Sequence, residues 1–167
     1  MKKLMILCLL LCSQAHALDI EFIGGDKKSY KKFSSGPTLF VNIATRCGYT
    51  GQLTDLEALY QKYKAKGLKV VGIPSNDFGG QTPEENADVK KFCRLKYGAT
   101  FPIMKKAKVT GDSKHALVKK LIGSGDEIAW NFEKFLVNDN KVVARFKSGV
   151  KPKSRELTQS IEKVLKN

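Results

Sequence analysis

Cys47 is the residue of this chain best placed for redox chemistry. It stands in "NIATRCGYT", between an apolar run at 38–44 and a helical pattern of leucines that begins at Leu53. Where a strand leads into a helix, unpaired backbone N–H groups and the positive end of the helix dipole stabilise an anion. We therefore expect Cys47 to react as a thiolate. The alternative is a small, buried and inert side chain.

The surrounding sequence excludes two common kinds of cysteine site. In "CGYT", Thr50 occupies the position where a Cys-x-x-Cys pair has its second sulfur, so dithiol exchange within this motif is excluded. Two of the four cysteines and one of the two histidines lie in residues 1–17, which we expect to be removed. Besides Cys47, only Cys93 and His115 then remain among the cysteines and histidines. So few residues of these types favour neither a disulfide-rich scaffold nor a metal site.

The first 17 residues, "MKKLMILCLLLCSQAHA", are typical of a secretory signal peptide. Two lysines precede an apolar run, and the closing "AHA" is the small-x-small pattern after which signal peptidase cuts. A lipid anchor at Cys12 is disfavoured because the bulky Leu11 precedes it. The mature chain would be a single domain at 18–167, exported across the inner membrane to the periplasm.

The chain is strongly basic. It has 30 Lys and Arg residues against 16 Asp and Glu, a formal net charge of +14, and the loss of Lys2 and Lys3 with the signal peptide would leave +12. The lysines are spread along the chain without a basic motif interleaved with aromatic residues, so nucleic acid is not an expected partner. A solvated surface is the favoured interpretation, with weak association with an anionic membrane surface as a secondary consequence.

Hydrophobic periodicity predicts the elements that position Cys47. The continuous apolar runs "TLFVNIA" at 38–44 and "LKVVGIP" at 68–74 are typical of strands buried on both faces. Apolar residues at helical spacing lie between them, and Gly67 is a suitable stop for that helix. This pattern predicts a β-α-β unit with two parallel strands and a right-handed crossover.

Further elements follow this unit. "TPEE" predicts a second helix that is capped by Thr82 and runs to about Tyr97. A short helix near 113–122 precedes a hairpin formed by "NFEKFLV" and "KVVARF", and Pro152 with Ser154 introduces a final helix. This order predicts a thioredoxin-like α/β fold with a central mixed sheet and flanking helices. In open sheets of this type, function collects outside the carboxyl ends of the parallel strands.

Four motifs resemble those of the glutathione peroxidase family. "NIATRCGYT", "PSNDFGGQ", "FPIM" and "WNFEKFLV" occur in the family's order and approximate spacing, between about residues 38 and 147. The resemblance implies that Cys47 reacts with peroxide and that Gln81, Trp130 and Asn131 support it. It also implies a thiol-dependent peroxidase that reduces hydrogen peroxide and organic or lipid hydroperoxides. Such an enzyme has no cofactor or metal, and a thioredoxin-like protein or glutathione serves as its external reductant.

The placement of the three supporting residues agrees with this implication. Gln81 ends the loop after the second predicted strand, so it can face the same sheet edge as Cys47. With the indole N–H of Trp130 and the amide of Asn131, it could hold a thiolate and the charge on a leaving oxygen without a histidine base. Taken singly, each has a simpler interpretation: a core tryptophan, a loop amide, and an asparagine bonded to its own backbone.

The implied reaction leaves a sulfenic acid on Cys47, which a second thiol must then reduce. Cys93 is the internal candidate. Family members with an internal resolving cysteine carry it in this segment, but an alignment anchored on "FPIM" places it one residue later, at Arg94. Cys93 also falls on the apolar face of the predicted helix, so a resolving role and a structural role both remain open.

Some features depart from the family pattern. Ser75, Asp77 and Thr82 differ from the residues usual at those positions, and no long insertion precedes Trp130. The short form resembles monomeric members that have an open site, accept bulky hydroperoxides and prefer thioredoxin-like reductants. Two alternative functions remain: a thiol-disulfide oxidoreductase or redox sensor, against which Thr50 argues, and a basic binding protein that keeps the scaffold without turnover.

Overall fold

The structure, a computed structural model, describes residues 18–166, so the predicted signal peptide lies outside the described residues. No helix within 18–166 has the length and apolar character needed to cross a membrane. In chain order the elements are β1 (Asp19–Glu21), β2 (Lys27–Ser29), α1 (Lys31–Ser34), β3 (Thr38–Ile43), α2 (Gln52–Tyr63), the short 3₁₀ helix η1 (Lys64–Lys66), β4 (Lys69–Pro74), α3 (Asn86–Tyr97), α4 (Ala116–Ile122), β5 (Lys134–Asn138), β6 (Lys141–Phe146) and α5 (Arg155–Leu165).

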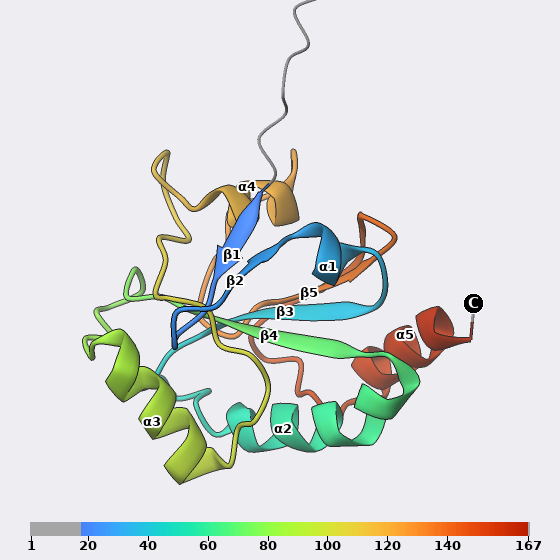
Figure 1. The fold of residues 1–167 in the computed structure, drawn as a ribbon, viewed down its shortest axis with the longest axis horizontal. Coiled ribbons are helices and arrows are strands. Elements are labelled where there is room, and N and C mark those ends of the chain that lie inside the picture. Colours follow the sequence, from blue (N-terminus) through green and yellow to red (C-terminus); the bar gives the residue numbers. More distant parts are fainter. Residues whose placement is uncertain (1–17, 167) are drawn as a thin grey trace, which may run out of the picture.

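A four-stranded mixed sheet forms the centre of the molecule, with the strand order β4-β3-β5-β6 (Figure 1). Strands β3 and β4 are parallel and α2 connects them, which confirms the predicted β-α-β unit. Strand β5 runs antiparallel to β3, and β6 antiparallel to β5. The two-residue turn between β5 and β6 has positive φ at Asp139 and Asn140 (46° and 62°), as a type I′ hairpin turn requires.

Two apolar cores cover the two faces of the sheet. Helices α2, α3 and α5 pack against one face, where side chains of β3 such as Leu39 and Val41 point toward them. Helices α1 and α4 and strand β1 pack against the other face, together with Phe40. The alternation along β3 explains why this strand is apolar throughout. The arrangement confirms the thioredoxin-like α/β fold.

The start predicted for the second helix is wrong. Helix α3 begins at Asn86, and Thr82 caps nothing: its N–H donates to Asn76 Oδ1 (2.8 Å), and its buried hydroxyl has no hydrogen-bond partner among residues 18–166. Lys106 Nζ also binds the carbonyls of Thr82 and Glu84 (3.3 and 2.8 Å). These tertiary contacts fix the "TPEE" segment outside the helix. The predicted end at Tyr97 is confirmed, with Gly98 left-handed after it.

The hairpin of β1 and β2 and the single turn of α1 were not predicted. The strands contain three residues each, and β2 reads "KKS", which has no apolar alternation. They are held by Ile20 and Phe22, which are buried in the second core. Tertiary burial of two side chains, rather than a periodic pattern, therefore creates this hairpin.

Candidate active site

The sheet topology brings the predicted site residues to one edge. Cys47 follows the carboxyl end of β3, and Gln81 lies in the segment after β4, which is parallel to β3. Strand β5 is antiparallel to β3, with Lys134 opposite Val41, so the segment that enters β5 reaches the same edge. Residues far apart in the sequence meet there for this reason.

Cys47 lies in a tight loop just before α2 and is 8% exposed. Its N–H donates to Thr50 Oγ1 (3.0 Å), and the same hydroxyl donates to the carbonyl of Ala44 (3.0 Å). The N–H of Tyr49 donates to the Cys47 Sγ atom (3.5 Å). The loop thus aims a backbone N–H group at the sulfur. The first residue of α2, Gln52, follows Cys47 by five positions, so Cys47 belongs to the loop that leads into the helix and not to its first turn.

Gln81 and Asn131 contact each other directly. The Asn131 Nδ2 group donates to Gln81 Oε1 (3.0 Å), and Asn131 is fully buried. The Gln81 carbonyl accepts the N–H groups of Thr45 and Arg46 (3.1 and 3.0 Å), which ties it to the Cys47 loop. Within residues 18–166, however, neither amide forms a hydrogen bond with the sulfur.

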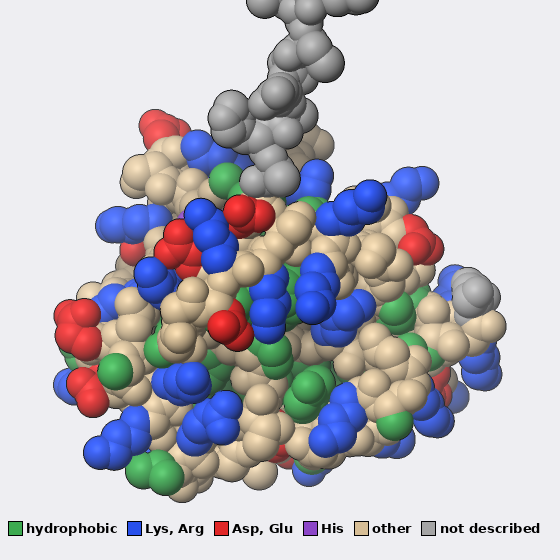
Figure 2. Space-filling view, in the orientation of Figure 1, with side chains coloured by type: hydrophobic (Ala, Val, Ile, Leu, Met, Phe, Trp, Pro, Cys, Tyr) green, Lys and Arg blue, Asp and Glu red, His purple; other side chains and the backbone are tan. Residues whose placement is uncertain are grey.

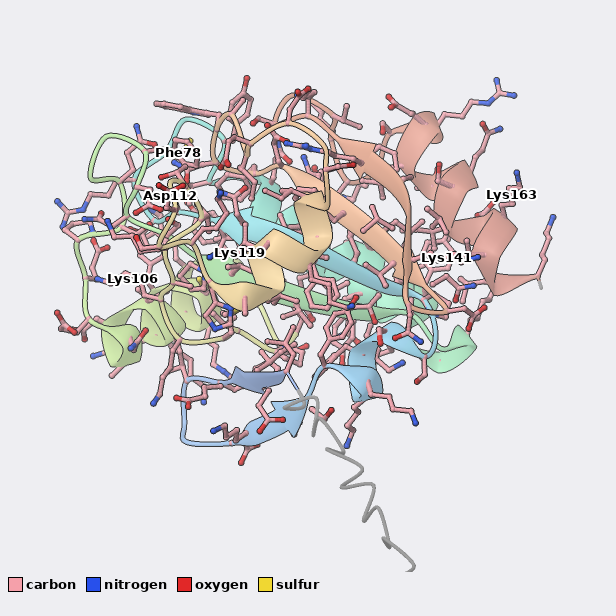
Figure 3. The ribbon with its side chains drawn as sticks, turned by 90° about the horizontal axis from the view of Figure 1, so that it is seen from above. Phe78, Lys106, Asp112, Lys119, Lys141 and Lys163 are labelled. Atoms are coloured by element: carbon pink, nitrogen blue, oxygen red, sulfur yellow. The ribbon has the colours of Figure 1, made fainter. Side chains whose placement is uncertain are left out.

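Trp130 is 40% exposed, so the interpretation of this residue as part of the core does not hold. Its ring packs against Phe78, with the ring centroids 5.4 Å apart. Tyr49, beside Cys47 in sequence, is exposed to the same extent. Figure 3 shows Phe78 at the end of the molecule away from Lys141 and Lys163. The exposed Trp130 ring and the partly buried Phe78 ring thus join two of the segments that meet here, and aromatic rings of this kind suit apolar ligands.

Asn42 is a site residue that the sequence reasoning missed. It lies within the apolar strand β3 and is 1% exposed. Its Nδ2 group donates to Asn131 Oδ1 (3.4 Å), and its Oδ1 accepts the N–H of Glu133 (3.1 Å). The available signal was a lone amide inside a strand that is buried on both faces, because such a group needs hydrogen-bond partners.

The segment that Asn42 holds is strained. Phe132 has a φ of 67°, and its N–H donates to the Asn42 carbonyl (2.7 Å). A bulky residue in this left-handed region costs about 1–3 kcal/mol and persists only where its surroundings enforce it. The strain lies directly between Asn131 and β5, which is consistent with a functional constraint on Asn131.

A buried ion pair fixes the loop that carries Trp130. The Glu133 carboxylate is 1% exposed, contacts the Arg145 guanidinium (2.8 Å) and accepts the N–H of Ala129 (2.9 Å). Arg145 also donates to two carbonyls of the preceding loop (2.6 and 2.8 Å). Breaking a buried pair leaves an uncompensated charge, so this loop is held firmly.

Arg46 pairs with Glu84 rather than with Cys47. Its Nε atom donates to the Glu84 carboxylate (2.8 Å), which also accepts the Thr45 hydroxyl. Burial of this carboxyl raises its pKa, but the hydrogen bonds from Thr45 and Arg46 outweigh burial and hold the pKa below its usual value. The pair joins the Cys47 loop to the segment after Gln81.

Cys93 is 1% exposed and lies on α3 within the same core as Cys47. Burial raises the pKa of its thiol to about 12. Both cysteines are free thiols. Inside the intact helix, Cys93 is therefore a poor nucleophile.

Among residues 18–166, no group of three or more His, Cys, Asp or Glu side chains is arranged to hold a metal ion. His115 instead caps α4, where its Nδ1 atom accepts the N–H of Leu117 (3.1 Å). The chemistry that the site itself provides is that of a cysteine sulfur, with the Gln81–Asn131 pair bonded to the loop that carries it.

Comparison with known proteins gives the same picture. The sequence model described as "Glutathione peroxidase" matches residues 15–122. A glutathione peroxidase-like peroxiredoxin of Chlamydomonas reinhardtii is 41% identical over 156 residues, which cover 90% of this chain and 95% of that protein. A hydroperoxy fatty acid reductase of Synechocystis is 43% identical over 128 residues, covering 76% of this chain and 83% of that protein.

A solved structure extends the similarity to three dimensions. The crystal structure of the T. cruzi protein GPX1 superposes with a TM-score of 0.66 at 30% identity, covering 89% of this chain and 94% of that one. The similarity thus extends over about nine-tenths of the chain, in sequence and in fold. The chain belongs to the glutathione peroxidase family.

Proposed function

We propose that the protein is a thiol-dependent peroxidase in which Cys47 reduces hydrogen peroxide and organic or lipid hydroperoxides. One observation supports particular residues for this role. The segments that carry Cys47, Gln81 and Asn131 come together, since Asn131 bonds to Gln81 (3.0 Å) and the Gln81 carbonyl bonds to the Cys47 loop. Family membership supplies the reaction class, and the geometry supports these residues as the ones that perform it.

The proposed first step is attack of the Cys47 thiolate on the distal oxygen of the hydroperoxide. An S–O bond forms, the O–O bond breaks, and the leaving oxygen takes a proton to become water or an alcohol. The sulfur is oxidised to a sulfenic acid. The N–H of Tyr49 already points at the sulfur (3.5 Å). The Gln81 amide and the Trp130 indole N–H would stabilise the charge that develops on the leaving oxygen.

The second step needs a thiol. A thiol condenses with the sulfenic acid to give a disulfide and water, and a further thiol reduces that disulfide. We propose that Cys93 is the internal resolving thiol and that a thioredoxin-like protein or glutathione supplies the final electrons, with no bound cofactor. Because Cys93 is buried in α3, its attack requires that helix to open locally.

The aromatic surface supports bulky substrates. The Phe78–Trp130 pair and the exposed ring of Tyr49 belong to segments that lead to the edge where Cys47 lies, and such rings suit the acyl chain of a lipid hydroperoxide. One relative is named a hydroperoxy fatty acid reductase, which supports the same substrate class.

We also propose that the mature protein is a periplasmic monomer. The leader "MKKLMILCLLLCSQAHA" supports export, and the absence of a long insertion before Trp130 supports a single open site. The basic surface would add weak attraction to anionic membranes, where lipid hydroperoxides form.

The replacement Cys47→Ser tests the assignment. We expect it to abolish consumption of hydrogen peroxide and of a fatty acid hydroperoxide in the presence of thioredoxin or glutathione, because a hydroxyl cannot accept the oxygen as the thiolate does. Circular dichroism and the midpoint of thermal unfolding should match the wild type. Undiminished peroxide consumption by this variant would refute the role of Cys47.

A further inference from the structure

We infer that Asn42 is a positioning residue that fixes which ends of the Asn131 and Gln81 amides face the reaction. The inference rests on the proposed function and concerns how its donors are oriented. Asn42 touches neither the sulfur nor the peroxide, and it acts through a chain of hydrogen bonds that links three side-chain amides in series. We call this chain the amide relay, formed by Asn42, Asn131 and Gln81.

The relay begins at a group whose polarity cannot change. The backbone N–H of Glu133 can only donate, and it donates to Asn42 Oδ1 (3.1 Å). The carbonyl end of the Asn42 amide is therefore committed to Glu133. Its Nδ2 end must face Asn131, where it donates to Oδ1 (3.4 Å).

The same logic continues to Gln81. Asn131 uses its oxygen to accept from Asn42, so its Nδ2 end faces Gln81 and donates to Oε1 (3.0 Å). Gln81 then uses its oxygen on Asn131, and its Nε2 group has no protein partner among the described residues. The relay thus leaves an N–H donor, and not an oxygen, for the charge that develops on the leaving oxygen. Reversing any one amide would reverse those that follow it.

The surroundings hold the first amide firmly. Asn42 is 1% exposed and Asn131 is fully buried, so water does not compete for these bonds. The Asn42 backbone also exchanges hydrogen bonds with the strained segment: its N–H donates to the Glu133 carbonyl (3.2 Å), and its carbonyl accepts the N–H of Phe132 (2.7 Å). Backbone and side chain of one residue therefore fix both the path of this segment and the orientation of its amide.

Neutron diffraction from crystals of the unmodified, deuterated protein tests the relay directly. The expected nuclear density places both deuterium atoms of Asn42 on the side of Asn131, and those of Asn131 on the side of Gln81. Density that shows the Asn131 oxygen facing Gln81 would overturn the inference. This measurement does not depend on whether any variant folds.

The variant Asn42→Asp tests the consequence for reactivity. The introduced carboxylate can only accept, so it should draw the Asn131 Nδ2 group toward itself and turn the Gln81 oxygen into the site. We expect the second-order rate constant for oxidation of Cys47 by hydrogen peroxide to fall about 100-fold, the size of effect seen when one oriented donor is lost. The rate is followed by rapid quenching and mass spectrometry of Cys47.

Asn86→Asp is the matched control. Asn86 also accepts a backbone N–H through Oδ1, from Lys106 (2.7 Å), but its side chain donates to no second amide. The same chemical change there should leave the rate within twofold of the wild type. Equal rates for the wild type and both variants would overturn the inference, whereas a wild type that oxidises at Cys47 too slowly to consume peroxide would refute the proposed function instead.

The pH dependence separates positioning from loss of structure. At low pH the introduced carboxyl is protonated and its O–H can donate to Asn131 Oδ1, which restores the polarity of the relay. The ratio of the Asn42→Asp rate to the wild-type rate should therefore rise as the pH falls. Glu133 and its partner Arg145, the charged groups bound to this segment, are present in every variant, and the same ratio for Asn86→Asp gives the pH trend of a carboxylate introduced outside the relay. A ratio that is constant with pH would contradict the relay.

Discussion

Thr50 shows how a single residue decides the chemistry of its neighbour. It stands where a dithiol motif has its second sulfur, and its hydroxyl instead joins the Cys47 N–H to the Ala44 carbonyl (3.0 Å each). The position therefore stabilises the loop that presents the sulfur and takes no part in electron transfer. This argues against the thiol-disulfide oxidoreductase interpretation at the level of one side chain.

Lys134 gives a prediction on the same scale. It is fully buried on β5, and its Nζ atom donates to the carbonyls of Ser148 (3.2 Å) and Val150. Burial lowers its pKa from 10.5 to about 8. Between these two values the unfolded chain binds a proton that the folded chain has lost, so the contribution of Lys134 to stability rises with pH. Below about pH 8 Lys134 is protonated in the folded protein, and the buried cation lowers the free energy of unfolding.

We therefore expect the free energy of unfolding of the wild type, relative to Lys134→Met, to increase between about pH 7.5 and pH 10. The increase should be of order 3 kcal/mol at most, from 1.36 kcal/mol for each pKa unit. Urea unfolding at a series of pH values measures it. Lys141→Met, at an exposed position of β6, is the control and should show no such trend. A flat difference for Lys134→Met would contradict the burial argument.

At the scale of elements, α3 is held by few buried residues. Of its twelve residues only Val89 and Cys93 are buried, whereas α2 buries five residues of its twelve. A helix with little buried apolar surface opens locally at low cost in free energy. Opening would also release the Cys93 thiol from the burial that raises its pKa to about 12.

We expect one equivalent of hydrogen peroxide to produce first a Cys47 sulfenic acid and then, more slowly, a Cys47–Cys93 disulfide. Mass spectrometry of peptides from samples quenched at successive times measures both species. In Cys93→Ala the sulfenic acid should persist until an external thiol is added. If it also persists in the wild type, Cys93 is structural and the resolving thiol is external.

At the scale of the whole molecule, the charge is distributed rather than focused. Figure 2 shows Lys and Arg side chains scattered over the visible face, with few acidic ones among them. Some of the cations are also paired, as in Arg46 with Glu84 and Lys153 with Asp55 (2.8 Å each). The proposed attraction to anionic membranes would therefore act through the overall field of this surface and not through a defined pocket.

We expect the mature chain, residues 18–167, to co-sediment weakly with vesicles that contain anionic phospholipid and not with neutral vesicles. The screening length falls from about 30 Å at 0.01 M salt to about 3 Å at 1 M, so binding should disappear at high salt. Binding that resists salt would point to apolar insertion of the exposed aromatic rings instead. No binding at low salt would contradict an electrostatic attraction.

The sequence by itself determined the order of the main elements and the family, and it led to the prediction that Cys47 is the reactive cysteine. These features follow from local information: apolar runs, helical spacing, and four motifs that resemble one family. The strands of the central sheet, α2, α5 and the end of α3 appear where hydrophobic periodicity and turn residues place them. Local patterns suffice here because the spacing of apolar residues along an element shows whether one or both of its faces are buried.

Only the tertiary structure decided which groups touch. The capping signal at Thr82 was overridden by the bond that its N–H donates to Asn76 and the bond that its carbonyl accepts from Lys106. The β1–β2 hairpin depends on the burial of two side chains. Asn42 was hidden for the same reason, because its role arises from segments about 90 residues away in the sequence. A single side-chain amide produces no periodic pattern in the sequence, and its role depends on the hydrogen-bond partner that the fold brings to it.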